Sequence, residues 1–173
     1  MQQKRTVPRR PALQVTMGPD GHLYVGAGGH IRVHAASAHF AAVVIDDLCR
    51  IANLSEGAAL LASCDVLGHR IIIATPKTPI DPPNGTIEPE DRSAATLAGG
   101  LTGQQDADGD PILGTGAGSG SRICYDPADW PWQGDPASPC AARVLLALLR
   151  QARVNAMGAD DPTDGRPCAA EGG

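Results

Sequence analysis

The spacing of apolar residues changes within the first 74 positions, and this change constrains the fold more than any other feature of the sequence. Apolar and polar residues alternate over 13–26, on both sides of the turn Gly18–Gly21, and again over 30–34. Alternation of this kind predicts a β-hairpin and a third strand. Over 38–53 apolar residues recur every three or four positions, which predicts an amphipathic helix that Ser37 caps.

A second helix and further strands are predicted downstream. The stretch that opens at Ser55 predicts a short helix over 56–64. The isoleucine-rich run 69–74 predicts a buried strand, because it is short, apolar and bounded by glycine and proline. Residues 75–120 show no period and carry many prolines and glycines, so we expect one long irregular loop there. The chain returns to a strand at 122–126.

The most apolar helical pattern lies near the C-terminus. Ser138 at the N-cap followed by Pro139 is a strong start signal, because proline lacks an N–H that would be unpaired at that position anyway. The pattern predicts a helix over 139–156 that ends at Gly158. Its apolar stripe is formed by Val144, Leu145, Leu148, Leu149 and Ala152.

These elements together predict a single α+β domain, in which about three helices pack on a small, mostly antiparallel sheet. We place the domain at 13–158. A basic arm at 1–12, which we expect to be flexible, precedes it, and a polar tail at 159–173 follows it. The chain has one Phe, two Tyr and two Trp, so its core is expected to be aliphatic.

Charge and cysteine usage exclude several classes of partner. The formal net charge is −5, whereas domains that bind nucleic acid usually carry a basic face. No run approaches the roughly 20 apolar residues that a membrane span needs, and the N-terminus lacks the apolar stretch of a signal peptide. The five cysteines form no C-x-x-C pair and are an odd number, which indicates reduced thiols in a cytosolic setting. We expect neither nucleic acid nor a membrane as partner.

Two glycine-rich stretches and the histidines give weaker signals. The stretch 114–121 lacks the lysine of a phosphate loop and leads into a strand, so we interpret it as a flexible linker, and 26–29 as a turn. His30 and His34 share one predicted strand, where four residues span about 13 Å, too far to reach one zinc ion together. A combination of His34 with His39 or His69 remains open.

Other polar side chains could carry chemistry. Asp126, Asp129 and Asp135 lie beside prolines or in turns, where aspartate usually bonds local backbone amides, so we favour a structural role over acid–base catalysis. Cys140 would lie in the first turn of the last helix, where a thiol becomes more acidic. No partner base for Cys140 is identifiable in the sequence.

The segment GTGAGSGSRICYDPADWPWQGDPASP, followed by VLLALLRQA, carries a family resemblance. The N-terminal part, from VTMGPDGHLYVG to GHRIIIATP, matches more weakly. Together they resemble the effector zinc-metallopeptidase domains of type III secretion effectors and of the toxin ends of Rhs-type proteins, over about residues 13–160. The resemblance implies a zincin-like fold.

In that family the helix after Val-Leu carries His-Glu-x-x-His, whose histidines hold one zinc ion while the glutamate activates a water molecule. The resemblance places these residues at Ala147, Leu148 and Gln151. None of the three can replace the family residue, so we expect no metal and no other cofactor. Glu171 is the acidic residue near the place expected for a third ligand.

The resemblance therefore implies a bacterial effector or toxin-like domain, which we expect to be secreted without a cleavable signal peptide and to be otherwise cytoplasmic. We expect it to bind a protein in a host or competitor cell through Tyr125, Asp126, Trp130 and Gln151. The alternative is an active hydrolase that uses other residues, such as Cys140 with a histidine, or Asp126. A third hypothesis is a plain interaction module of a secretion-linked protein.

Overall fold

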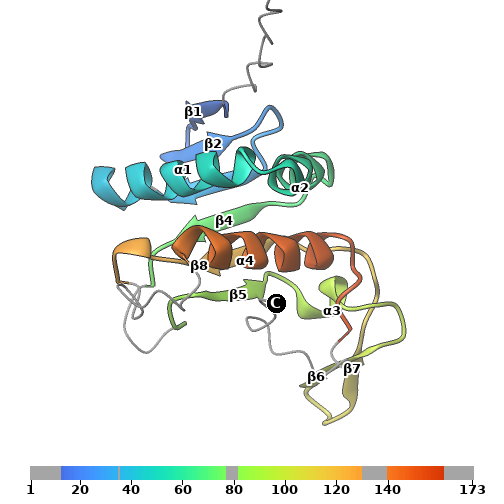
Figure 1. The fold of residues 1–173 in the computed structure, drawn as a ribbon. Coiled ribbons are helices and arrows are strands. Elements are labelled where there is room, and N and C mark those ends of the chain that lie inside the picture. Colours follow the sequence, from blue (N-terminus) through green and yellow to red (C-terminus); the bar gives the residue numbers. More distant parts are fainter. Residues whose placement is uncertain (1–12, 35, 77–81, 130–139, 162–173) are drawn as a thin grey trace, which may run out of the picture.

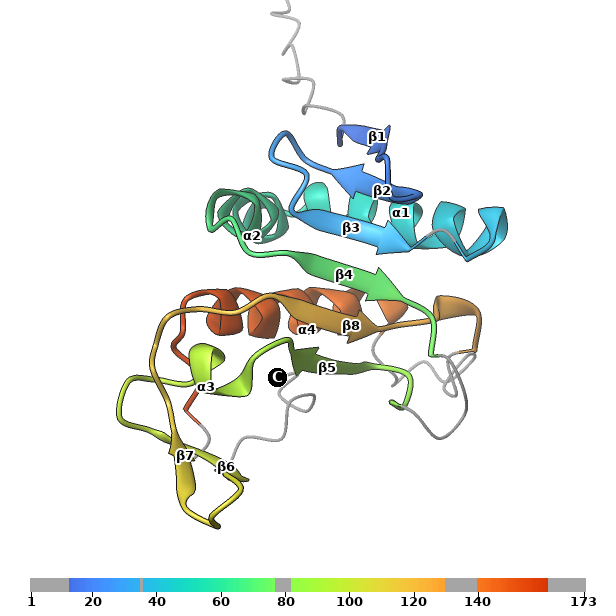
Figure 2. The same cartoon turned by 180° about the vertical axis from the view of Figure 1, so that it is seen from behind.

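Six strands and three long helices form two layers in the computed structural model, which describes residues 13–34, 36–76, 82–129 and 140–161 (Figure 1). The order across the sheet is β1-β2-β3-β4-β8-β5. Its strands are β1 (Val15–Met17), β2 (His22–Val25), β3 (Ile31–His34), β4 (Ile71–Ala74), β5 (Thr86–Pro89) and β8 (Ser121–Cys124). One face of the sheet is covered by α1 (Ala38–Ala52), α2 (Ser55–Val66) and α4 (Ala141–Ala156). No helix of the described residues covers the other face, which is called the open face (Figure 2).

The sheet is mixed, so the prediction of a mostly antiparallel sheet is wrong, whereas the α+β class is confirmed. The pairs β1–β2, β2–β3 and β8–β5 are antiparallel, and the pairs β3–β4 and β4–β8 are parallel. α1 and α2 form the crossover between β3 and β4, and a crossover of this kind returns the chain in its original direction. The predicted hairpin over 13–26 and the predicted third strand are confirmed.

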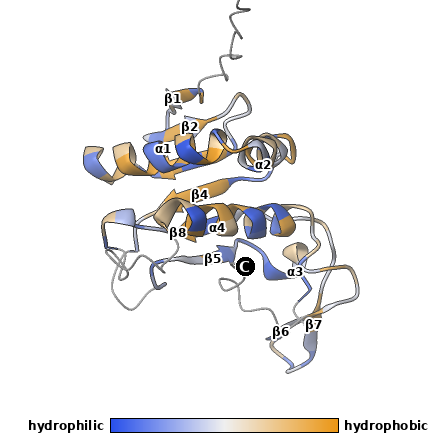
Figure 3. Ribbon diagram, in the orientation of Figure 1, coloured by the Kyte–Doolittle hydropathy of each residue, from blue (hydrophilic) through white to orange (hydrophobic). Residues whose placement is uncertain are grey.

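Local sequence explains how the helix layer and the core form. α1 begins where Ser37 Oγ accepts a hydrogen bond from Phe40 N at 3.1 Å, as the capping signal predicts. On β3, Ile31 and Val33 are buried under the helices, while Arg32 lies on the open face. Figure 3 shows apolar residues gathered on β4, on β8 and along one side of α1. The core is largely aliphatic, as the composition predicts.

Residues 75–120 are more regular than predicted. They hold β5, the one-turn helix α3 (Arg92–Ala95) and a hairpin of β6 (Leu101–Gln105) and β7 (Pro111–Leu113). Asp91 Oδ1 starts α3 by accepting a hydrogen bond from Ala94 N at 3.0 Å. The expectation of a single irregular loop is wrong because these elements are short and interrupted by glycine and proline, which hides their period.

The glycine-rich stretch 114–120 packs against the end of α4, so its interpretation as a flexible linker is wrong. Ser119 N donates a hydrogen bond to Asn155 O at 2.9 Å. Gly118 has a φ of +85°, and a Cβ at this position would collide with the backbone oxygen of Ala156. Glycine is needed here because two backbone segments approach each other closely.

The last helix begins at Ala141 rather than at 139, and its N-cap residue is Cys140 rather than the predicted Ser138. Gly158, with a φ of +62°, follows the helix as predicted. Within the described ranges, no helix combines the length and the apolar character that crossing a membrane requires. The predictions for the arm 1–12, for Trp130, Asp135 and Glu171, and for most of the tail lie outside the described residues.

Candidate functional site

Tyr125 directly follows β8 and lies in the core rather than on the surface. Its hydroxyl donates a hydrogen bond to Asp47 Oδ2 of α1 at 2.7 Å, and Asp47 is only 3% exposed. Arg50, one turn further along α1, places Nη1 at 3.5 Å from Asp47 Oδ1. Burial, and then the hydrogen bond and negative charge of Asp47, raise the pKa of Tyr125 well above its usual range. The pair joins the end of β8 to the middle of α1.

Asp126 stabilises its own loop. Its Oδ1 accepts a hydrogen bond from Ala128 N at 2.9 Å, which begins the single 3₁₀ turn Pro127–Asp129. Its backbone N donates to Asn84 Oδ1 at 2.8 Å, and Asn84 Nδ2 donates back to Asp126 O at 2.8 Å. This is the local bonding that an aspartate next to proline favours. The structure thus places Asp126 between two chain segments as a turn former.

Cys140 is exposed and immediately precedes α4, where its side chain makes no capping hydrogen bond. Among the described residues, which include all five histidines, it makes no hydrogen bond to a histidine. A cysteine nucleophile needs a neighbouring base to form its thiolate at neutral pH. Within the described ranges, the geometry therefore supplies no histidine base for the hydrolase hypothesis at Cys140.

Gln151 on α4 belongs to a polar cluster at the end of that helix. Its Nε2 donates to Asn155 Oδ1 and to Asp160 Oδ1, both at 3.1 Å. Asn155 is buried, and its Nδ2 donates to Ser121 Oγ at 3.0 Å. One turn earlier, Ala147 presents only a methyl group. The nitrogen of the Gln151 amide therefore donates to two acceptors, Asn155 and Asp160.

Asp160 is the member of this cluster that the sequence analysis missed. It lies just after Gly158, and its backbone holds it in place: Asp160 N donates to Ala95 O at 3.0 Å, and Leu97 N donates to Asp160 O at 2.8 Å. Gly158 was the sequence signal for this contact, because a helix-ending glycine turns the chain back alongside the end of its helix. The structure brings Asp160 to Gln151.

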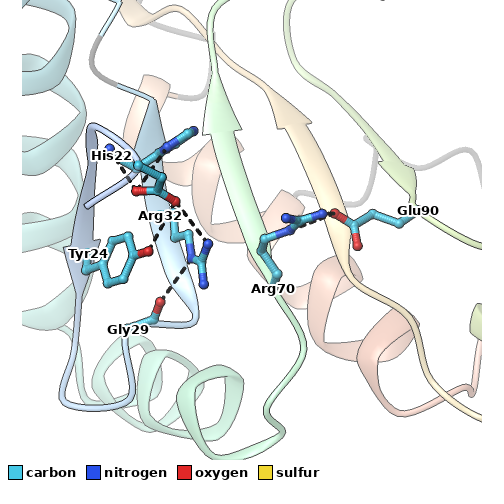
Figure 4. A network of polar contacts seen from close by, with 7 residues as sticks. His22, Tyr24, Gly29, Arg32, Arg70 and Glu90 are labelled. Atoms are coloured by element: carbon cyan, nitrogen blue, oxygen red, sulfur yellow. Dashed lines mark hydrogen bonds and ion pairs between the residues drawn. The ribbon is translucent and has the colours of Figure 1, made fainter. Parts of the chain in front are cut away.

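The open face of the sheet carries a second polar network (Figure 4). Asp20 Oδ2 accepts hydrogen bonds from Tyr24 OH and from Arg32 Nη1, each at 3.1 Å. The guanidinium of Arg32 lies 4.6 Å from the centre of the Tyr24 ring. His22 and His34 are register partners on β2 and β3, and their ring centroids are 5.0 Å apart. These contacts link two strands and the turn between β1 and β2.

The structure pairs His34 with His22, a residue that the sequence analysis did not select, rather than with His39 or His69. The register of the predicted hairpin could have identified this pair. In the part of the chain that the structure describes, no group of three or more His, Cys, Asp and Glu side chains could hold a metal ion. Further across the open face, Arg70 Nη2 pairs with Glu90 Oε1 at 2.6 Å (Figure 4).

The buried Cys64 on α2 is expected to make the protein less stable at alkaline pH. Its thiol is buried and donates to Leu149 O at 3.8 Å, and burial raises the pKa of Cys64 from 9.0 to about 11. Above pH 9 the unfolded chain loses this proton while the folded chain keeps it. Stability is therefore lost as pH rises, by about 1 kcal/mol per pH unit between pH 9 and 11.

Urea unfolding at a series of pH values checks this prediction. The variant Cys64→Ala, measured between pH 9 and 10, should lack most of the slope, although it will be less stable at every pH. Tyr125 adds its own loss only above pH 10, since that is the pKa of an unfolded tyrosine. An unchanged slope in Cys64→Ala would assign the effect to another group.

Comparison of the chain with protein-family models, with curated proteins and with solved structures found no match.

Proposed function

We propose that this chain is a metal-free relative of the effector zinc metallopeptidases, and that it acts by binding a protein of a host or competitor cell. The observation that carries the proposal is the hydrogen bond from Gln151 Nε2 to Asp160 Oδ1 at 3.1 Å. A carboxamide there donates to a carboxylate at the position where the family resemblance calls for an imidazole that binds zinc.

The residues present do not fit a zinc ion. Ala147 offers a methyl group, and Leu148 is 1% exposed within the aliphatic core, so it can neither bind a metal nor accept a proton. The Nε2 of Gln151 already donates to Asn155 and to Asp160, and a carboxamide is a poor substitute for an imidazole as a zinc ligand. These three side chains cannot activate water by the metallopeptidase mechanism, so in this proposal the surface of the domain is its functional part.

The surrounding architecture supports a zincin-like assignment. α4 packs against β8 and against the edge strand β5, which runs antiparallel to β8. Asp160 bonds Gln151, so a carboxylate is positioned next to one of the two places where the family has histidines. In this proposal the scaffold of a metal site persists while its ligands have been replaced.

Restoring the two histidines tests the proposal. We expect the wild-type protein to purify without stoichiometric zinc, and the double variant Ala147→His/Gln151→His to bind one zinc ion per chain. Histidines four residues apart share a helix face, and Asp160 would complete the site. Adding Asp160→Ala should weaken zinc binding by about tenfold or more, because one of three ligands is lost. Calorimetric titration and elemental analysis measure both effects.

The wild-type protein serves as the control in a peptide-cleavage assay with and without chelator. Stoichiometric zinc or chelator-sensitive cleavage in the wild type would contradict the loss of metal. A folded double-histidine variant that binds no zinc would contradict the zincin-like scaffold. Cleavage that is abolished by Cys140→Ala would favour the hydrolase hypothesis instead.

A further inference from the structure

The two edges of the six-stranded sheet differ in how they are protected against pairing with another strand. On β5, Glu90 N donates a hydrogen bond to Gly120 O, next to β8. In an antiparallel ladder every second residue bonds the neighbouring strand, so the backbone groups of Ile87 and Pro89 point away from β8. Pro89 has no N–H, and Glu88 adds a charge. Proline and charge on an edge strand are the usual means of blocking further pairing.

β1 has no such protection. Gly26 N donates to Gln14 O, and Gly18 N donates to His22 O, so the backbone groups of Val15 and Met17 point away from β2. Among the described strands, none pairs with this side of β1. The strand contains neither charge nor proline, and Met17 is 67% exposed. β1 therefore presents free donors and acceptors.

An apolar cavity of about 530 Å³ lies next to the start of this strand, between the sheet and α2. Its floor is a row of three residues: Ile31 on β3, its register partner Val25 on β2, and Leu13. Leu13 precedes β1 by two residues and lies on the same face as Val15, the register partner of Val25. Small side chains on the helix side leave the space open: Ala52, Ala58 and Ala62. The next member of the row would come from a strand added to β1.

The glycine turn 26–29 forms one wall of the cavity and is fixed to α2 by hydrogen bonds. Asp65 of α2 accepts hydrogen bonds from Gly28 N at 2.7 Å and from His30 N at 3.3 Å. A Cβ on Gly28 would lie 2.7 Å from Asp65 Oδ1, so only glycine allows this approach. The rest of the cavity is lined mainly by aliphatic side chains, so it favours an apolar group.

We propose that an extended segment of a partner protein pairs with the free edge of β1 and places an apolar side chain in this cavity. Backbone hydrogen bonds to Val15 and Met17 supply affinity, and the cavity selects a segment with aliphatic residues at alternate positions. This inference rests on the proposed function, protein binding, and names the surface that performs it.

The test uses the full chain and a fluorescent, acetylated probe peptide, Lys-Thr-Leu-Thr-Leu-Thr-Lys amide, with a control peptide that has serine at both leucine positions. We expect the leucine peptide to bind more tightly. Ala58→Leu fills the cavity and should weaken binding by about tenfold, the effect of losing one buried anchor. Ala59→Leu is the matched control, because Ala59 is an exposed neighbour that does not line the cavity.

A second pair of variants separates the backbone from the side chain. Met17→Pro removes an outward N–H without touching the ladder to β2 and should also weaken binding by about tenfold, whereas Met17→Thr keeps the N–H and should retain most of it. Circular dichroism confirms that each variant is folded.

Three results would overturn the inference: no binding of the leucine peptide, equal binding by Ala58→Leu, or equal binding by Met17→Pro. A dimer in sedimentation that Met17→Pro dissolves would make a second copy the occupant and also overturn it. Zinc content is measured on the same preparations. A zinc-free protein that ignores the peptide overturns this surface alone, whereas a zinc-bound wild type overturns the proposed function.

Discussion

Replacing Tyr125 by phenylalanine is expected to lower the free energy of unfolding by about 2–4 kcal/mol, although the two side chains have nearly the same shape. The reason is Asp47, whose buried carboxylate accepts the tyrosine hydroxyl at 2.7 Å. Without that donor, Arg50 at 3.5 Å is the remaining partner seen for this carboxylate among the described residues. Urea unfolding at pH 7 measures the change.

A double-mutant cycle separates this bond from packing. Asp47→Leu leaves the tyrosine hydroxyl without its acceptor, while the double variant Asp47→Leu/Tyr125→Phe removes donor and acceptor together. The double variant should be more stable than the sum of the two single changes predicts, by about 1 kcal/mol or more, because neither polar group is then left buried alone. Strict additivity would show that the two groups do not interact.

Replacing Gly57 by alanine is expected to destabilise the protein by about 2–4 kcal/mol, although alanine in a helix is normally about 1 kcal/mol better than glycine. Gly57 lies in the first turn of α2, directly against the end of α1. A Cβ here would collide with the backbone oxygen of Ile51 and would lie 2.8 Å from Ile51 Cγ2. The backbone at the junction of α1 and α2 would have to move.

Ala59→Gly is the matched control for Gly57→Ala, because Ala59 is exposed on the same helix. It should cost about 1 kcal/mol, the ordinary propensity difference. Thermal unfolding of both variants checks the prediction. A Gly57→Ala protein as stable as the wild type would mean that the two helices can separate slightly without loss.

The elements that the sequence predicts well are those with long and regular patterns. α1 could be placed because its period continues over four turns and Ser37 is available as a cap. The direction of β4 relative to β3 could not be predicted from its own residues, because a buried strand has the same apolar pattern in a parallel and in an antiparallel pair. Only the two intervening helices indicated a crossover.

The candidate site was predicted less well because its contacts join distant parts of the chain. Tyr125 was predicted to contact a protein partner, yet the structure buries it. Its hydrogen-bond partner Asp47 lies 78 positions earlier, within the predicted helix 38–53. Gln151 was selected through the resemblance. Its contact with Asp160 depends on how the chain folds back after Gly158, which no local pattern specifies.

The order of strands in the sheet has a consequence for synthesis. β8 is inserted between β4 and β5, although it follows both along the chain, and β5 has no other described partner. During translation β4 is therefore made before β8, and also before α4, which packs against α1 and α2. The side of β4 that later pairs with β8 has no strand partner until residue 124 has been translated.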